Sequence, residues 1–185
     1  MSWIREIDVD EAEEDLKEIY DELAESRGKV SNILKVHSLN PDAMRAHLDL
    51  YMSVMFKNTN LNRKECEMIA VVVSAANECE YCVRHHMEAL NHYWRDEKKV
   101  ERLAVDYSDL NIDEKKMRML EFSKKLTLEP NNIEKKYFDE IKDCGFEDQE
   151  LLDIVLVVSY FNFVNRIALG LGVEVDENEV GGYDY

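Results

Sequence analysis

The sequence predicts an all-helical fold, and three observations support this expectation. Apolar residues recur mostly at spacings of three and four, which is the periodicity of a helix with one buried face. The chain has only two prolines and six glycines, so long elements are seldom interrupted. Its 185 residues suit one compact domain. We therefore expect a single helical domain over residues 1–175, followed by a loose acidic tail over residues 176–185.

Capping and turn residues mark the helices of the first half. Gly28 is expected to end the first helix, because glycine accepts the left-handed backbone that closes many helices. Asn40 and Pro41 have the form of an N-cap and a first-turn proline. Asn62 and Glu65 have the spacing of a capping box, and the helix they open is apolar on nearly all sides, so we expect it at the centre. The expected helices span about 10–26, 32–37, 41–56, 63–76 and 79–94.

The second half is divided by its other turn residues. The charged stretch 95–99 is interpreted as a solvated turn or the start of a helix. Pro130 and Gly145 then separate three further segments with helical periodicity. These segments span about 113–127, 133–143 and 148–169.

A faint internal repeat is visible when the chain is compared with itself at an offset of 85 residues. Apolar periodicity explains the matching valines, but it does not readily explain the matching serines and asparagines. The sequence therefore predicts two related helical units, and only the first carries reactive side chains. The matching residues are Glu65, Ile69, Val72, Val73, Ser74 and Asn77 with Glu150, Ile154, Val157, Val158, Ser159 and Asn162.

Charge and composition exclude several classes of function. A net charge of −17 repels phosphate backbones and anionic lipid surfaces, so we expect no nucleic-acid partner and no membrane partner. The longest apolar runs have the length of core helices, and the N-terminus lacks the pattern of a secretory signal, so we expect a cytoplasmic protein. No phosphate-binding loop or dinucleotide fingerprint is present in the sequence.

The stretch NECEYCVRHH, residues 77–86, concentrates the chemistry of the chain. In a reducing compartment a close cysteine pair is more typical of catalysis or metal binding than of a structural disulfide. On a helix Cys79, Cys82 and His86 fall within roughly 60° of arc, whereas His85 points about 100° away from His86. Helical geometry therefore selects His86 as the imidazole that can address Cys82.

A thiolate at the start of a helix would be a nucleophile. Unpaired backbone N–H groups and the helix dipole stabilise an anion there, and a neighbouring histidine can accept the thiol proton. A second cysteine one turn away could capture a sulfenic acid formed on the first and close a disulfide. The pair can therefore carry out one half of a peroxidase cycle.

The spacing of these residues resembles a known family. The pattern Glu67-x11-Cys79-x2-Cys82-x3-His86 is similar to the active-site signature of the alkylhydroperoxidase D-like (AhpD-like) branch of the carboxymuconolactone decarboxylase family. The segments MIAVVVSAANECEYCVRHH and VVSYFNFVNRIALGLGV resemble its peroxidase-related proteins, and the likeness extends from about Ile4 to Val175.

The resemblance implies a thiol-dependent peroxidase, or antioxidant disulfide oxidoreductase, without a cofactor. Cys82 would be the peroxidatic cysteine and Cys79 the resolving one, while Glu67 and His86 with a bound water would remove the proton from Cys82. The substrate would be a hydroperoxide, and an external dithiol or a protein reductant would restore the thiols. The family also implies an oligomer, either a homotrimer or a homohexamer.

Two features of the signature carry expectations of their own. The best-studied relatives have a histidine before the second cysteine, but this chain has Tyr81, which titrates near 10 and cannot act as a base at neutral pH. Tyr81 is interpreted as a packing residue or a wall on the substrate side. We expect burial to raise the pKa of Glu67 and suit it to proton exchange near neutrality.

Other interpretations of the cysteine pair stay open at this point. Two thiolates, an imidazole and the carboxylate of Glu67 could hold zinc, although the spacing is tighter than in most structural zinc sites. The chain could be a metal-binding or redox-sensing module without turnover, or a decarboxylase of the carboxymuconolactone type. Cys79 and Cys82 could also be two small buried residues. Cys66 and Cys144 are expected to be inert buried thiols.

Overall fold

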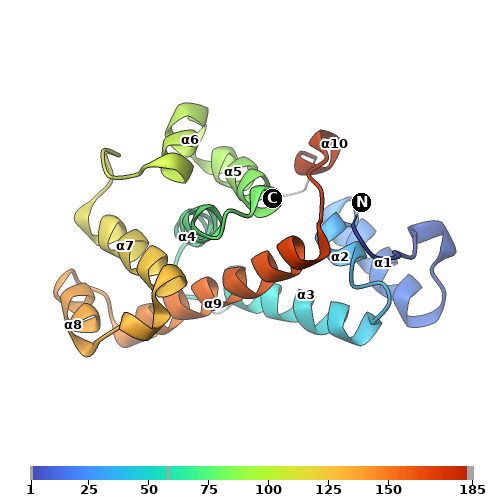
Figure 1. The fold of residues 1–185 in the computed structure, drawn as a ribbon, viewed down its shortest axis with the longest axis horizontal. Coiled ribbons are helices and arrows are strands. Elements are labelled where there is room, and N and C mark those ends of the chain that lie inside the picture. Colours follow the sequence, from blue (N-terminus) through green and yellow to red (C-terminus); the bar gives the residue numbers. More distant parts are fainter. Residues whose placement is uncertain (1, 58, 183–185) are drawn as a thin grey trace.

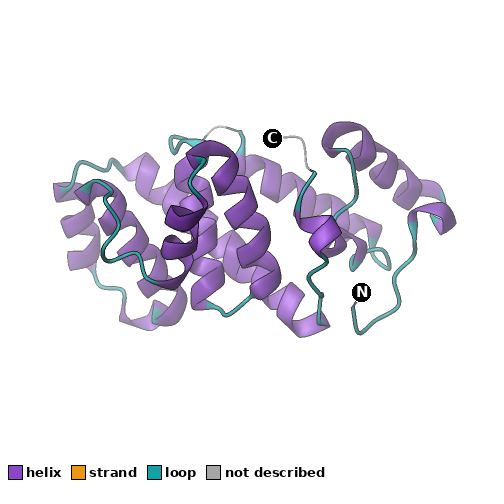
Figure 2. Cartoon of the chain, turned by 90° about the horizontal axis from the view of Figure 1, so that it is seen from above, coloured by secondary structure: helices purple, strands orange, loops and turns teal. Residues whose placement is uncertain are grey.

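The computed structural model describes residues 2–57 and 59–182, and this part of the chain is helical without strands, as the sequence predicted. Figures 1 and 2 show the arrangement of the helices. Short 3₁₀ turns at Val9–Glu11 and Pro130–Asn132 accompany them. The helices are α1 (Glu14–Arg27), α2 (Asn32–Lys35), α3 (Pro41–Met55), α4 (Arg63–Ala76), α5 (Glu80–Trp94), α6 (Glu97–Val105), α7 (Glu114–Leu128), α8 (Lys135–Asp143), α9 (Asp148–Leu171) and α10 (Glu177–Val180).

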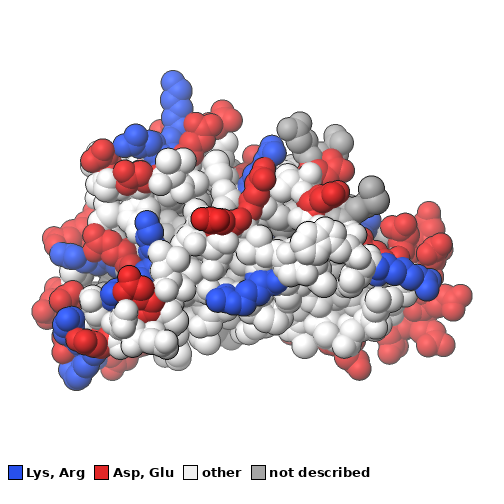
Figure 3. Space-filling view, in the orientation of Figure 1, with Lys and Arg blue, Asp and Glu red and all other residues white. Residues whose placement is uncertain are grey.

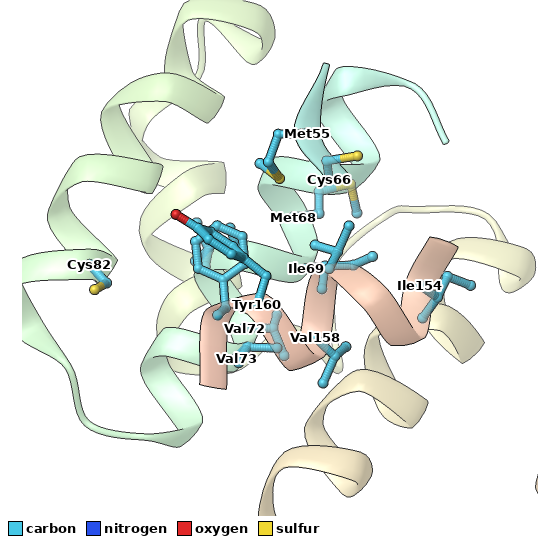
Figure 4. Packing of buried hydrophobic residues seen from close by; sticks show 14 of the residues in the cluster. Met55, Cys66, Met68, Ile69, Val72, Val73, Cys82, Ile154, Val158 and Tyr160 are labelled. Atoms are coloured by element: carbon cyan, nitrogen blue, oxygen red, sulfur yellow. The ribbon is translucent and has the colours of Figure 1, made fainter. Parts of the chain in front are cut away.

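Helix α4 lies at the centre of the fold and packs against α5, α6, α7 and α9. Every residue from Cys66 to Ser74 is buried, because a helix surrounded by other helices has no polar face. Figure 4 shows side chains of α4 interleaved with Ile154, Val158 and Tyr160 of α9, and Cys82 at the edge of the same view belongs to this buried cluster. The sequence prediction of a central helix here is confirmed.

Helix α9 is the longest described helix and runs from the side of α8 to the side of α2 (Figure 1). It is the one helix in residues 2–57 and 59–182 whose length and composition would allow it to cross a membrane. It packs against α3, α4 and α7, as the core helix of a helical domain does. At its C-terminal end the Leu171 carbonyl accepts a hydrogen bond from the Trp3 N–H at 2.8 Å, so the N-terminal segment lies beside it.

A buried polar network joins α4 to α9 behind the cysteine stretch. The Asn77 amide donates to Asn162 Oδ1 at 3.2 Å and to Asn165 Oδ1 at 2.9 Å. Asn165, which has no exposed surface, donates to Ser74 Oγ at 3.1 Å. Buried amides need such partners, so the network fixes how these two helices align. Asn77 and Asn162 are also a matched pair in the proposed internal repeat, which stays a prediction.

The predicted helix boundaries agree closely with the structure. Gly28 ends α1 with a left-handed backbone at φ 80°, and Asn40 caps α3 by accepting the Ala43 N–H. Asn62 and Glu65 form both hydrogen bonds of the capping box. The largest difference is α6, where the sequence indicated only a charged turn or a helix start at 95–99.

Charged side chains gather toward the two ends of the molecule in the view of Figure 3. A mostly uncharged band crosses the middle of this face along α9. Helix α9 contributes the half-exposed side chains Leu152, Leu156, Phe163 and Leu169.

Candidate functional site

A cavity of about 90 Å³ lies between α2, α3, α5 and α9. One water needs about 10 to 15 Å³ of such space, so the cavity has room for several waters or a small reactive head group. Ile33, Leu34, Leu48, Ala89 and Val164 line it with apolar surface. Its polar lining includes Cys82, His86, Arg63, His47, Tyr51 and Tyr160.

Glu67 has no exposed surface and contacts two residues that line the cavity, His86 and Arg63. Its Oε2 accepts from His86 Nδ1 at 2.6 Å, and its Oε1 contacts Arg63 Nη2 at 2.5 Å. Because Nδ1 of His86 is committed to the carboxylate, Nε2 is the ring nitrogen left to exchange a proton in the cavity. The structure therefore joins two residues that the sequence proposed, and adds Arg63, which the sequence analysis did not single out.

The expected pKa shift of Glu67 is wrong in sign. Burial does raise the pKa, but His86 and Arg63 outweigh burial and the net shift is downward. Glu67 is thus a permanent carboxylate that orients His86, and not a group that exchanges protons near neutrality. The sequence could show that Glu67 lies in an apolar helix, but not that two cations face it.

The two cysteines occupy the start of α5. Cys79 is the N-cap residue and Cys82 lies in the first turn, where free backbone N–H groups favour an anion. Both thiols are free and buried, and they hydrogen-bond to each other. Within the described part of the chain, Cys82 is the one of the pair that lines the cavity.

The proton of the pair is shared unequally. The hydrogen bond from Cys82 lowers the pKa of Cys79. The same bond, together with burial, raises the pKa of Cys82 well above 9.0, although a hydrogen bond from Asn165 acts in the opposite direction. We expected Cys82 to be the ionised sulfur, and this direction corrects that expectation. Ionising Cys82 requires the proton to move to Cys79 or to another base.

Tyr81 lines the cavity but its hydroxyl is held by the C-terminal segment. The hydroxyl donates to Glu179 Oε1 at 2.7 Å and accepts from the Ile33 N–H at 3.1 Å. His85 donates from Nδ1 to the Tyr81 carbonyl, and its Nε2 lies 3.0 Å from Glu179 Oε2. The interpretation of 176–185 as a loose tail did not anticipate these contacts.

The buried position of Glu179 affects its ionisation. Burial raises its pKa, but bonding to His85 and then to the Asn32 N–H and Tyr81 lowers it to about 2. The carboxylate therefore stays charged while it holds α10 against the start of α2 and against α5. Residues 183–185 of the predicted tail lie outside the described residues.

Three further polar side chains line the cavity that were not singled out from the sequence. His47 and Tyr51 come from one face of α3, where they recur at the spacing of one helical turn. Tyr160 comes from α9, and its hydroxyl lies 2.9 Å from His47 Nε2. A polar residue recurring on an otherwise apolar helix face was the available signal, but that pattern does not identify the neighbouring helix.

The arrangement does not favour the zinc interpretation. Both oxygens of Glu67 are used by Arg63 and His86, so the fourth ligand considered for zinc is occupied. No group of three His, Cys, Asp or Glu side chains suited to a metal ion is found among residues 2–57 and 59–182.

Comparison with known proteins assigns the family. The family model described as the carboxymuconolactone decarboxylase family matches residues 41–109, which include α3 to α6. A solved peroxidase-related protein from Silicibacter sp. TM1040, itself uncharacterised, is 30% identical, with 89% of this chain and 86% of that chain covered and a TM-score of 0.83. The chain belongs to the carboxymuconolactone decarboxylase family.

Two other solved structures resemble this chain over most of its length. An uncharacterised peroxidase-related protein from Ralstonia eutropha JMP134, described as an alkylhydroperoxidase AhpD core, is 27% identical over 97% of this chain and 94% of its own, with a TM-score of 0.88. The fold is therefore AhpD-like. The debrominase Bmp8 is 18% identical over 90% and 91% of the two chains, with a TM-score of 0.75, a likeness in fold alone. Since one fold carries different reactions, the reaction must be argued from the site.

Replacing Glu67 by Gln tests the buried ion pairs. Removing one partner of a buried charge network costs about 3 to 5 kcal/mol, so we expect a loss of that order in the free energy of unfolding at pH 7. The pKa of Glu67 is lowered on folding from 4.5, so its contribution is complete above pH 4.5 and is lost as the pH falls through the lower folded value. The difference in unfolding free energy between wild type and Glu67→Gln, measured by urea titration, should therefore become smaller below about pH 4.5.

A matched control is Glu80→Gln, which changes an exposed glutamate in the first turn of α5. This substitution should change the unfolding free energy by less than about 0.5 kcal/mol. Equal stability of Glu67→Gln and wild type at pH 7 would contradict the described role of Glu67.

Proposed function

We propose that this protein is a thiol-dependent hydroperoxidase in which Cys82 and Cys79 cycle between dithiol and disulfide. The observation that carries the proposal is a hydrogen-bonded cysteine pair at the start of α5, with Cys82 facing a cavity that His86 also lines. The family and the peroxidase-related description of two solved relatives support this assignment. The antioxidant role is proposed on the same grounds, in the cytoplasm that the sequence indicated.

The reaction proceeds in two balanced steps. Ionised Cys82 attacks the terminal oxygen of the hydroperoxide, an S–O bond forms, the O–O bond breaks, and the alkoxide leaves with the electron pair and takes a proton. Cys79 then attacks the sulfur of the sulfenic acid, and water leaves as the disulfide closes. An external dithiol or a protein reductant returns two electrons and two protons and restores both thiols.

His86 is the proposed base for Cys82. Glu67 orients the ring through Nδ1, so Nε2 can accept the proton either from Cys82 directly or through water. The need for such a base follows from the raised pKa of Cys82, which keeps the resting thiol protonated. Arg63 adds a fixed positive charge at the same cavity and favours an anion there.

Single-cysteine variants distinguish the roles of the two sulfurs. In the wild type, one equivalent of peroxide should remove two thiols per chain, and mass spectrometry should find a Cys79–Cys82 disulfide. In Cys79→Ser we expect a sulfenic acid that dimedone traps on Cys82, because no resolving thiol is left. In Cys82→Ser we expect no thiol loss on the same time scale.

Cys66→Ser is the control for this experiment. Burial, together with Glu67, raises the pKa of Cys66 to about 12, so this thiol should not react and the variant should behave as wild type. Oxidation of Cys82→Ser at the wild-type rate would refute the assignment of the attacking sulfur.

Replacing His86 by Gln tests the proposed base. Glutamine can still donate a hydrogen bond to Glu67, but it cannot accept the thiol proton at neutral pH. We expect the single-turnover rate with hydroperoxide at pH 7 to fall by about 10²-fold, and the pH dependence of thiol alkylation to shift upward. His92→Gln, at an exposed position on the same helix, should leave both unchanged, and an unshifted alkylation profile in His86→Gln would exclude the relay.

We also propose that the protein acts as the homotrimer or homohexamer that the resemblance implied. The row of half-exposed apolar side chains on α9 supports this, because a second copy could cover them. Light scattering should report a trimer or hexamer for the wild type and a smaller species for Leu156→Asp. A monomeric wild type at micromolar concentration would contradict the proposal.

A further inference from the structure

A chain of two histidines leads from a backbone carbonyl to the cavity. His37 Nδ1 lies 3.0 Å from the Ile33 carbonyl, and His37 Nε2 lies 3.3 Å from His47 Nδ1. His47 Nε2 lies 2.9 Å from the hydroxyl of Tyr160, which lines the cavity. The proposed cysteine chemistry and the His86 relay use none of these three side chains.

The carbonyl at one end fixes the direction of every hydrogen bond in the chain. A carbonyl only accepts, so His37 carries its proton on Nδ1 and, when neutral, accepts on Nε2. His47 must then donate from Nδ1 and accept on Nε2, which means that the Tyr160 hydroxyl donates to His47. Tyr160 therefore directs its hydrogen at His47, and the lone pairs of its oxygen are left to accept.

The ionisation of the two rings is consistent with this direction. Burial lowers the pKa of His37, although its bond to Ile33 acts the other way. Burial and then the neighbouring His37 lower the pKa of His47 to about 4. Both rings are thus neutral at pH 7. Burial first, and then Tyr51 and Cys82, raise the pKa of Tyr160 well above 10.0, so it keeps the proton that it donates.

Tyr51, on the same cavity, has the opposite hydrogen-bonding character. Its hydroxyl oxygen accepts from Arg27 at 3.3 Å and from Arg63 at 3.2 Å, and both donors are guanidinium groups. With its lone pairs occupied, the hydroxyl has one function left, which is to donate its hydrogen. No acceptor for that hydrogen is found among the described residues. The rings of Tyr51 and Tyr160 are 5.6 Å apart between centroids, and both side chains line the cavity.

We propose that Tyr160 and Tyr51 are catalytic residues that hold a hydroperoxide across Cys82, with Tyr160 accepting the peroxide O–H and Tyr51 donating to the oxygen that leaves. A hydroperoxide presents one donor and one acceptor on adjacent oxygens, which matches this pair. The substrate class is therefore a molecule with a free O–O–H group. This inference rests on the proposed peroxidase function and deepens it.

The proposal completes the proton balance of the first step. The Cys82 thiolate attacks the hydroxyl oxygen, the S–O bond forms, and the O–O bond breaks with its electron pair on the alkoxide. Tyr51 gives its proton to that alkoxide, which leaves as an alcohol, and the two guanidinium groups stabilise the phenolate until the proton that His86 took from Cys82 returns to it through water. The hydrogen held by Tyr160 stays on the sulfenic acid.

The experiment compares Tyr160→Phe and Tyr51→Phe in single-turnover thiol oxidation with two peroxides. Each variant loses one hydrogen bond to the reacting group. Its rate of thiol oxidation by tert-butyl hydroperoxide should therefore fall by about tenfold or more. With peracetic acid, Tyr160→Phe should remain slow, because the peracid also has an O–O–H group. Tyr51→Phe should approach the wild-type rate, since acetate leaves without needing a proton.

Three controls keep the test specific. Iodoacetamide has no peroxide group, so its rate with the thiols should stay within about twofold of wild type in both variants, which shows that the site is intact. Tyr107→Phe removes a hydroxyl that bonds the Leu120 carbonyl away from the cavity, and it should react as wild type. If Tyr51→Phe reduces the reaction rates with both peroxides equally, the assigned role of Tyr51 is refuted.

The outcomes separate this inference from the function on which it rests. Wild-type protein that does not lose thiols to any hydroperoxide would refute the peroxidase function itself. Wild-type protein that reacts, with both phenylalanine variants reacting equally fast, would refute the tyrosine pair and leave the function standing. Equal losses of peroxide and iodoacetamide reactivity would also refute the inference, because the hydroxyls would then be structural.

Discussion

One buried carboxylate constrains the whole site. Glu67 lies in the buried stretch of the central helix α4, where an unpaired carboxylate would be too costly to ionise. Arg63 from the first turn of α4 and His86 from α5 must therefore hold it from two sides. This requirement fixes the rotation of α5 about its axis, and with it the direction in which Cys82 faces. The cavity therefore lies beside the two residues, Arg63 and His86, that neutralise the Glu67 carboxylate.

Much of this arrangement could be predicted from the sequence because it is local. Helix periodicity, the Asn62 cap and the terminal Gly28 depend on neighbours within a few residues, and the structure confirms them. The choice of His86 over His85 also followed from helical phase, and the 2.6 Å contact with Glu67 agrees with that choice. The family resemblance joined Glu67 to the cysteines before any contact was known.

The rest depends on contacts between distant parts of the chain. Tyr160 meets His47 across 113 residues, and no spacing rule relates a tyrosine on one helix to a histidine on another. The sign of the Glu67 shift was wrong for the same reason, since burial was visible in the sequence and the opposing cations were not. The opposite pKa shifts of the two cysteines likewise depend on which sulfur donates the hydrogen bond. Only the relative placement of the two thiols decides which one donates.

Tyr81 departs from the family pattern, and this departure is compatible with the proposed peroxidase reaction. Tyr81 stands where the best-studied relatives carry a histidine. Its hydroxyl donates to Glu179 and accepts from the Ile33 N–H, so Tyr81 anchors the C-terminal segment and its proton is committed to Glu179. The acid and base work must then come from elsewhere in the cavity. Its walls provide a carboxylate-oriented imidazole, a hydroxyl turned to accept and another turned to donate. A site with these groups does not need a second histidine beside Cys82, because each proton of the proposed reaction already has a donor and an acceptor.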